Sequence, residues 1–246
     1  MLLSIIIPTL NFNNRNEVFK LISKQSIKDQ IELVLVFHKT GGYTNGVSID
    51  TTVLDSEKIN YKIIEFNGIF NFSAMNNLGY THSSGDYILF MNDDVFIEDS
   101  FILEGMVSDL EQYHSIGMLG DWHWPDESAL LKYKEKFYIR KEISGHFAMY
   151  RRKDLTLFGE KPWLEECYIV ASDDEMHWKV WKILNKFCAG KKIKVSHNQF
   201  STRKPLFEDK RMMEIDKNDH EVIMNKYKNM KCNTIIDGIP INFSFV

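Results

Sequence analysis

The sequence predicts an α/β domain with a mostly parallel central sheet flanked by helices, followed by a mixed-charge, helical C-terminal tail. Two features of the first hundred residues favour this class. Short apolar runs, typical of strands buried on both faces, alternate with helical patterns. Helices that connect such strands imply crossovers and parallel pairing. The length of 246 residues also suits one large domain with a substantial core.

Four strands and two helices are expected in this first part. The first strand is closed by Pro8, and a glycine pair at residues 41–42 signals a loop after the second. Strands are expected at residues 2–7, 31–37, 61–66 and 86–91, and helices at residues 14–27 and 73–83. Ligands of parallel sheets bind beyond the carboxyl ends of the strands, so the end of the fourth strand is a candidate binding position.

The second half continues with longer helical patterns. A helix is expected at residues 101–110 and strands around 116–119 and 143–150, with a tryptophan-rich loop between these strands. A long helix follows Ser172, and its apolar stripe is expected to extend to Phe187. From about residue 204 the charges are mixed in sign, with a weaker helical pattern through Met230. Residues 234–246 are compatible with an edge strand.

Composition excludes several classes of protein. The net charge of −4 gives no reason to expect nucleic-acid binding. Three cysteines without a CxxC spacing argue against a disulfide framework or a thiolate zinc site and fit a reducing compartment. No stretch approaches the roughly 20 apolar residues of a membrane span, and the first residues lack the basic segment of a secretory signal. We expect a cytoplasmic protein, with peripheral membrane contact left open.

The acidic turn of Asn92, Asp93 and Asp94 directly follows the fourth expected strand. Mg²⁺ and Mn²⁺ prefer hard oxygen ligands, and such an ion would offset the charge of a bound diphosphate. Side chains alternate in an extended segment, so Asn92 and Asp94 point one way and Asp93 the other. One face can hold a metal while the other reaches a ribose hydroxyl. The alternative is an ordinary polar turn, which Asn and Asp commonly form.

A second acidic group, SDDE at residues 172–175, opens the long helix. A carboxylate here could take the proton of an attacking hydroxyl. The spacing also makes a capping box, in which Ser172 is the N-cap and Glu175 reaches back to it. Both interpretations can hold if Ser172 and Glu175 cap the helix while Asp173 projects.

Three later residues could join such a site. His197 could complete a metal site as a neutral imidazole, although a lone histidine is more often structural. Arg203 and Lys204 could meet a diphosphate or simply lie at the surface.

The segment at residues 121–124 (DWHW) places two indoles beside an acidic group. Pyranose rings stack on aromatic side chains, so Trp122 and Trp124 suit a sugar acceptor. A role for these tryptophans in the core or at its rim fits equally well.

Taken in order, these segments resemble the family 2 glycosyltransferases. Residues 4–11 (SIIIPTLN) are similar to the family's first strand and nucleoside-contacting turn. Residues 72–79 (FSAMNNLG), Gly85-Asp86 and the acidic turn are similar to its helix and DxD block. Residues 143–152 (ISGHFAMYRR) resemble the glycine-containing strand near the transferred sugar. Residues 172–179 (SDDEMHWK) resemble the segment that carries the catalytic base.

The resemblance implies a GT-A fold and an inverting, metal-dependent transfer from a nucleotide-diphosphate sugar. Its implied roles are Asp173 as base, with Asp174 as the alternative, and Asp94 with His197 as ligands of Mn²⁺ or Mg²⁺. The remaining residues would bind the donor: Thr9, Asn11 and Asn76 around the nucleoside, and Asn92 and Asp93 at its phosphate or ribose. The acceptor would be a hydroxyl of a free, lipid-linked or protein-linked glycan.

The sequence departs from the family at the end of the second strand. The family usually has an aspartate there that holds the nucleotide base, whereas this chain has Phe37, His38 and Lys39. The nucleotide therefore stays open. Ser172 and Lys179 replace a glutamate and an arginine, and Lys179 keeps the charge without the planar fork.

The expected organisation is a transferase domain at residues 1–203 and a C-terminal helical extension at residues 204–246 packed on it. Residues 1–95 would be the nucleotide-binding half of the domain and residues 96–203 the acceptor half. Two alternatives are a non-catalytic carbohydrate- or nucleotide-binding relative and a sugar-phosphate nucleotidyltransferase. The latter is disfavoured because no glycine-rich phosphate loop follows the first strand.

Overall fold

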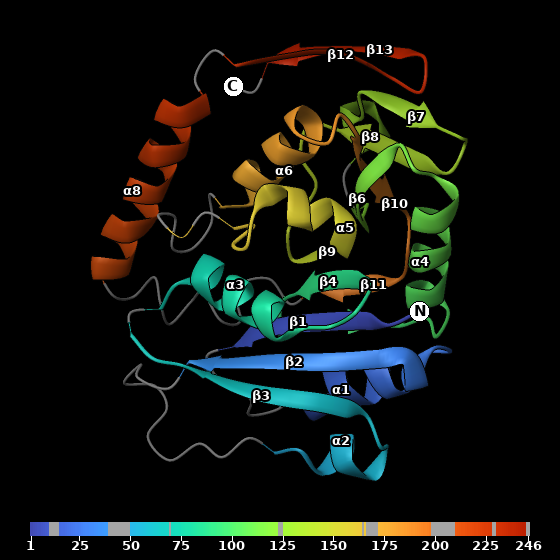
Figure 1. The fold of residues 1–246 in the computed structure, drawn as a ribbon, viewed down its shortest axis with the longest axis vertical. Coiled ribbons are helices and arrows are strands. Elements are labelled where there is room, and N and C mark those ends of the chain that lie inside the picture. The colour runs from blue at the N-terminus through green and yellow to red at the C-terminus, as the bar shows by residue number, and fades with distance from the viewer. Residues whose placement is uncertain are drawn as a thin grey trace.

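A nine-stranded sheet runs through the molecule in the order β3-β2-β1-β4-β9-β6-β10-β8-β7 (Figure 1). The computed structural model describes residues 1–9, 15–38, 50–68, 70–122, 125–163, 165, 172–197, 210–227 and 230–244. The strands are β1 Leu3–Thr9, β2 Ile31–His38, β3 Asn60–Phe66, β4 Tyr87–Met91, β6 Ile116–Asp121, β7 Leu131–Tyr133, β8 Phe137–Arg140, β9 Phe147–Arg151 and β10 Phe187–Lys191. All except β8 and β9 run in the same direction, so the sheet is mostly parallel, as predicted.

Two small antiparallel sheets accompany the large one. Strand β5 (Val95–Ile97) pairs with β11 (Val195–His197), and β12 (Lys231–Ile236) forms a hairpin with β13 (Ile239–Ser244). The first pair brings together segments that are about a hundred residues apart. The terminal hairpin lies at the top of the molecule in Figure 1 and is a sheet of its own, whereas residues 234–246 suggested a single edge strand.

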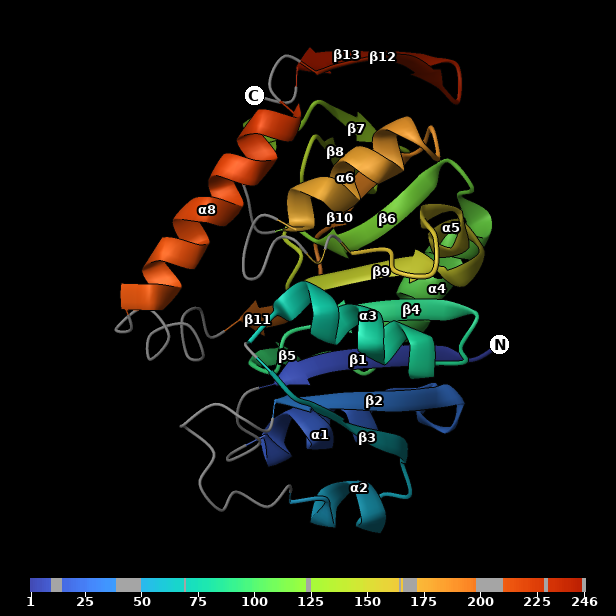
Figure 2. The ribbon, with the colours of Figure 1, turned by 60° about the vertical axis from the view of Figure 1, so that its left-hand side comes forward.

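Helices cover both faces of the large sheet. They are α1 Asn16–Ser23, α2 Thr52–Ser56, α3 Phe72–His82, α4 Ile102–Gln112, α5 Arg152–Leu155, α6 Ser172–Lys182 and α8 Lys210–Tyr227, with 3₁₀ turns η1 Lys28–Gln30, η2 Asp126–Ser128 and η3 Thr156–Phe158. Helix α3 packs so closely on β1 and β2 that a Cβ atom at Gly79 would lie 2.4 Å from Ile6. Helix α6 packs against β6 and β10 (Figure 2). No helix among the described residues has the length and apolarity needed to cross a membrane.

The long helix of the second half ends earlier than the sequence suggested. It stops at Lys182, and Phe187 is the first residue of β10 rather than part of the helical stripe. The chain turns at Asn185, which adopts a positive φ of 52°. The backbone N–H of Phe187 then donates to the carbonyl of Ser115, 2.7 Å away, which starts the pairing of β10 with β6.

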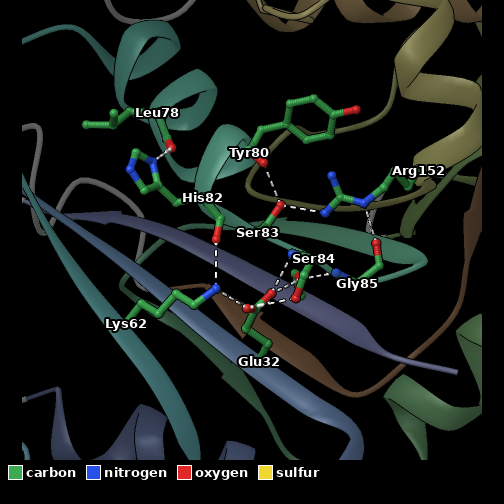
Figure 3. Close-up of polar contacts among 10 residues, drawn as sticks. Glu32, Lys62, Leu78, Tyr80, His82, Ser83, Ser84, Gly85 and Arg152 are labelled. Atoms are coloured by element: carbon green, nitrogen blue, oxygen red, sulfur yellow. Dashed lines mark hydrogen bonds and ion pairs between the residues drawn. The ribbon is translucent and has the colours of Figure 1, made fainter.

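The amino-terminal ends of β1 and β2 hold a buried polar network (Figure 3). Glu32 accepts hydrogen bonds from Ser4 Oγ at 2.6 Å, from the Ser84 N–H at 2.7 Å and from Lys62 Nζ at 2.6 Å. Burial alone would raise the pKa of Glu32, but the bonds from Lys62, Ser4 and Ser84 outweigh it and lower the pKa to about 2. Glu32 lies at the opposite end of the strands from the carboxyl edge where ligands bind, so this network stabilises the fold.

Candidate active site

The acidic turn follows β4, as predicted, and its carboxylates are buried. Asp93 accepts a short hydrogen bond from Thr9 Oγ1. It also forms an ion pair with Arg15, whose guanidinium nitrogen lies 3.2 Å from Asp93 Oδ2. Thr9 is the last residue of β1, which pairs with β4. Asp93 therefore joins two strand ends and the start of α1. Thr9 and Asp93 were predicted from the sequence to lie near the donor, whereas Arg15 was not singled out.

The predicted pair of Asp94 and His197 is brought together. His197 Nε2 lies 3.0 Å from Asp94 Oδ1, and the two side chains are largely buried. The ladder of β11 with β5 places His197 directly opposite Val95, the residue that follows Asp94. His197 also lines a cavity of about 470 Å³ between α1, β5 and β11.

His146 connects this pair to the rest of the site. Its ring stacks on that of His197, with centroids 4.2 Å apart and planes 12° apart. Its carbonyl accepts the backbone N–H of Asn92 at 2.9 Å, and its Nδ1 is hydrogen-bonded to Ser144 Oγ. The segment around His146 resembled a family motif in sequence, but His146 itself was not predicted to belong to the site. A histidine without acidic neighbours in the sequence does not indicate a site. The role of His146 becomes visible only in the folded chain, where its ring stacks on that of His197.

Gly145, the residue before His146, lies against Asp173. A Cβ atom at Gly145 would lie 2.1–2.4 Å from the three carboxyl atoms of Asp173, which is much closer than a van der Waals contact. Only glycine lets the carboxylate approach the backbone so closely. The two adjacent residues Gly145 and His146 thus contact the predicted base on one side and the predicted metal ligand His197 on the other.

The first turn of α6 differs from a simple cap. Glu175 was expected to reach back to the helix start, but its carboxylate pairs with Lys226 Nζ of α8 at 3.0 Å and with Lys179 Nζ at 3.5 Å. Lys179 also donates to the carbonyl of Pro162, and burial lowers the pKa of Lys179 despite the nearby Glu175. The side chain of Ser172 lies outside the described residues.

Asp174, the alternative base, has a different environment from Asp173. Its side chain is 44% exposed. Partial burial, and then the charge of Glu142, raise the pKa of Asp174 to about 6, while His220 of α8 opposes this rise.

The donor atoms of Asp94 and His197 fit the expected cation. A carboxylate oxygen and an imidazole nitrogen are ligands that Mn²⁺ accepts, and the two atoms face each other. No group of three or more His, Cys, Asp or Glu side chains that could hold a metal occurs in the part of the chain that the structure describes. The oxygens of a bound diphosphate would have to supply further ligands.

The remaining predicted residues divide into two groups. Asn76 is fully buried, and among the described residues neither its amide nitrogen nor its amide oxygen has a hydrogen-bond partner. A buried amide in this state costs free energy, and a polar ligand is one way to satisfy it. The other group, Asn11, Trp124, Arg203, Lys204 and the loop at residues 39–49, lies outside the described residues.

We expect Gly145→Ala to lower the rate constant of the predicted sugar transfer by about a hundredfold. The added methyl group would displace the Asp173 carboxylate, and small displacements of catalytic groups have effects of this size. Steady-state kinetics would measure the loss in kcat. Gly105→Ala is the matched control, because a Cβ atom at Gly105 would contact only the flexible end of Lys191, at 3.5 Å. Equal activity of the two variants would contradict the placement of Asp173.

The structure resembles solved glycosyltransferases. The mannosyltransferase PcManGT of Pyrobaculum calidifontis, in complex with GDP-Man and Mn²⁺, matches with a TM-score of 0.59 and 16% identity, over 77% of this chain and 54% of that chain. TarS of S. aureus matches with a TM-score of 0.59 and 18% identity, over 92% of this chain and 42% of TarS. Glucosyl-3-phosphoglycerate synthase of Mycobacterium tuberculosis, in complex with Mg²⁺ and UDP, matches with a TM-score of 0.60 and 12% identity. The match covers 99% of this chain and 87% of the synthase.

These likenesses establish the fold. The chain has the GT-A fold of nucleotide-sugar glycosyltransferases, as the sequence predicted. It spans about half the length of the mannosyltransferase and less than half of TarS. No family model matches the chain, and no curated protein matches it in sequence.

Proposed function

We propose that the chain is a metal-dependent, inverting glycosyltransferase that moves a sugar from a nucleotide-diphosphate donor to a hydroxyl of a glycan or glycoconjugate. The observation that carries this proposal is the continuity of the site. Gly145 contacts Asp173, and its neighbour His146 stacks on His197, which pairs with Asp94. A base and a diphosphate site joined in this way suit a transfer between two substrates.

The residues divide the work between donor and acceptor. Asp173 accepts the proton of the acceptor hydroxyl as the oxygen attacks the anomeric carbon of the donor sugar. The bond from that carbon to the diphosphate oxygen breaks, and the nucleoside diphosphate leaves with the bonding electrons. Attack opposite the leaving group inverts the anomeric configuration. The single displacement needs no second carboxylate, because no covalent sugar intermediate is formed.

The proposed donor side of the site lies at the carboxyl ends of β1 and β4. Thr9, Asn11 and Asn76 would line the nucleoside pocket, and Asn92 and Asp93 would position the ribose or phosphate. Asp94 and His197 would hold Mn²⁺ or Mg²⁺, which when bound would offset the charge that develops on the leaving diphosphate. The buried, unsatisfied amide of Asn76 supports a polar ligand at this end of α3.

A thermal-shift panel of UDP-, GDP-, dTDP- and CMP-sugars, with Mn²⁺ and with EDTA, tests the proposal. We expect one donor to raise the unfolding midpoint by roughly 5 °C at saturating concentration, only when Mn²⁺ is present. Asp94→Asn should abolish this shift. Asp99→Asn is the matched control, because Asp99 lies after β5 and accepts a hydrogen bond from the N–H of Phe101, just before α4. A panel without any metal-dependent shift would overturn the proposal.

Product analysis separates the remaining classes. A glycosyltransferase releases a nucleoside diphosphate and a glycosylated acceptor, whereas a nucleotidyltransferase acting in the synthetic direction releases pyrophosphate. A non-catalytic relative would bind the donor and release neither. Nuclear magnetic resonance of the product would assign the anomeric configuration, and retention would contradict the inverting mechanism.

A further inference from the structure

Arg15 lies where β1, β4 and α1 come together. It immediately precedes α1, and its Nη2 atom pairs with Asp93 Oδ2 at 3.2 Å. Asp93 belongs to the acidic turn after β4, and β4 pairs in parallel with β1. Ligands of parallel sheets bind beyond the carboxyl ends of the strands. Arg15 therefore places a positive charge at the edge where the proposed donor site lies.

The guanidinium group of Arg15 has donors to spare. Its Nη2 atom makes the ion pair with Asp93, whereas Nε is buried and has no hydrogen-bond partner among the described residues. A guanidinium carries five N–H donors, and a buried donor without a partner is unfavourable. The side chain is 16% exposed, so it is not closed off from solvent. A ligand with acceptor oxygens would satisfy the unpaired donors.

The Asp93 carboxylate, by contrast, is already paired. Its Oδ2 atom accepts the hydrogen bond from Thr9 Oγ1 and also pairs with Arg15. The side chain of Asp93 is only 5% exposed. A carboxylate in this position is suited to hold the guanidinium of Arg15 in place. A guanidinium that is already fixed loses less side-chain freedom when a ligand binds.

The two neighbouring carboxylates of the acidic turn would repel a diphosphate. Asp93 and Asp94 are both buried, and like charges repel more strongly where water is excluded. A divalent cation held by Asp94 and His197 would compensate one carboxylate, and Arg15 compensates the other. The positive charge of Arg15 thus lies beside the residue that precedes the proposed metal ligand Asp94.

We propose that Arg15 binds a phosphate group of the donor and that Asp93 holds Arg15 in position for this contact. The proposal rests on the proposed function, because it concerns the donor end of the same site. The planar fork of an arginine offers parallel N–H donors that match the oxygens of a phosphate. Asp93 then acts on the donor through Arg15, as a positioning residue.

Equilibrium binding of UDP, GDP, dTDP and their nucleosides to the full chain, with Mn²⁺, tests the inference. We expect Arg15→Gln to weaken binding of the preferred diphosphate by about tenfold or more and to leave binding of its nucleoside unchanged. Arg15→Lys keeps the charge without the fork, so it should retain part of the affinity. Lys20→Gln is the matched control, because it removes the same charge from the exposed last turn of α1. The unfolding midpoint of each variant without ligand shows that it is folded.

Asp93→Asn tests the positioning role separately. We expect it to weaken binding of the diphosphate more than binding of the nucleoside, and to add little to the effect of Arg15→Gln in the double variant. If Asp93 bound the ribose directly, Asp93→Asn would weaken binding of nucleoside and diphosphate alike. Its effect would then add to that of Arg15→Gln, and the positioning role would be wrong.

The possible outcomes separate this inference from the proposed function. Unchanged diphosphate binding in Arg15→Gln, or an equal effect of Lys20→Gln, would overturn the inference and leave the Mn²⁺-dependent donor site intact. Equal losses of nucleoside and diphosphate binding in Arg15→Gln would overturn it too, because they indicate a purely structural ion pair. If the unaltered chain bound no nucleotide with Mn²⁺, the proposed transferase itself would be contradicted, and the inference with it.

Discussion

Asp173→Asn is expected to lower the rate constant of sugar transfer by about 10²–10⁴-fold, the usual contribution of a general base. Asparagine has nearly the same shape, so it can keep the close packing against Gly145 while losing the ability to accept a proton. Donor binding with Mn²⁺ should stay unchanged, because the proposed donor site lies at Asp94. Transfer kinetics and the donor thermal shift would measure the two effects separately.

Asp174→Asn is the matched control for this substitution. The two carboxylates are adjacent in α6, but the side chain of Asp174 is 44% exposed, and the three atoms that lie nearest to a Cβ built at Gly145 all belong to Asp173. We expect a much smaller loss of activity for Asp174→Asn. A full loss in that variant, with Asp173→Asn still active, would transfer the role of base to Asp174.

Glu32→Gln is expected to have the largest effect on stability, lowering the free energy of unfolding by roughly 2–3 kcal/mol at pH 7. The pKa of Glu32 falls from its ordinary 4.5 to about 2 in the folded chain. A carboxyl group with a lowered pKa stabilises the fold above its unfolded pKa and loses this contribution as the pH falls. The difference between the two proteins should therefore shrink from about pH 4.5 to about pH 2. Urea denaturation at several pH values would measure it.

Glu57→Gln provides the comparison at the surface. Glu57 lies 3.7 Å from Lys28, and its side chain is 46% exposed. An exposed pair contributes about 1 kcal/mol or less. If the two substitutions destabilised the protein equally, the buried network around Glu32 would have no special role.

The sequence predicted the parallel half of the fold well because its strands are continuous apolar runs. Strands β1 and β2 are buried along their whole length, which leaves few polar interruptions in the pattern. The short strands β7 and β8 were missed, because strands of three or four residues are stabilised by partners distant in sequence. Strand β10 was missed for another reason: Phe187 continued the helical spacing of α6, and only tertiary pairing with β6 assigns it to the sheet.

The candidate site was predicted in its acidic residues and missed in its connecting residues. Asp94 and His197 could be paired from the resemblance, and the β5–β11 ladder provides the physical reason for their contact. His146 and Arg15 gave no local signal, since a stacked imidazole and an ion pair to Asp93 depend on the folded backbone. Gly145 was marked within its segment, but its need for a bare Cα follows only from the position of Asp173.

The ion pair of Glu175 with Lys226 bears on how the chain can be shortened. Residues 204–246 were expected to be an extension of the transferase domain, and α8 contributes Lys226 to a carboxylate whose side chain is only 5% exposed. In a fragment that ends before α8, Lys179 would be the remaining described cationic partner of Glu175. The face of α6 on which Trp178 contacts Tyr227 of α8 would become exposed. A shortened chain for biochemical work should therefore include α8, because Lys226, which lies beyond the predicted boundary, pairs with Glu175 in the helix that carries Asp173.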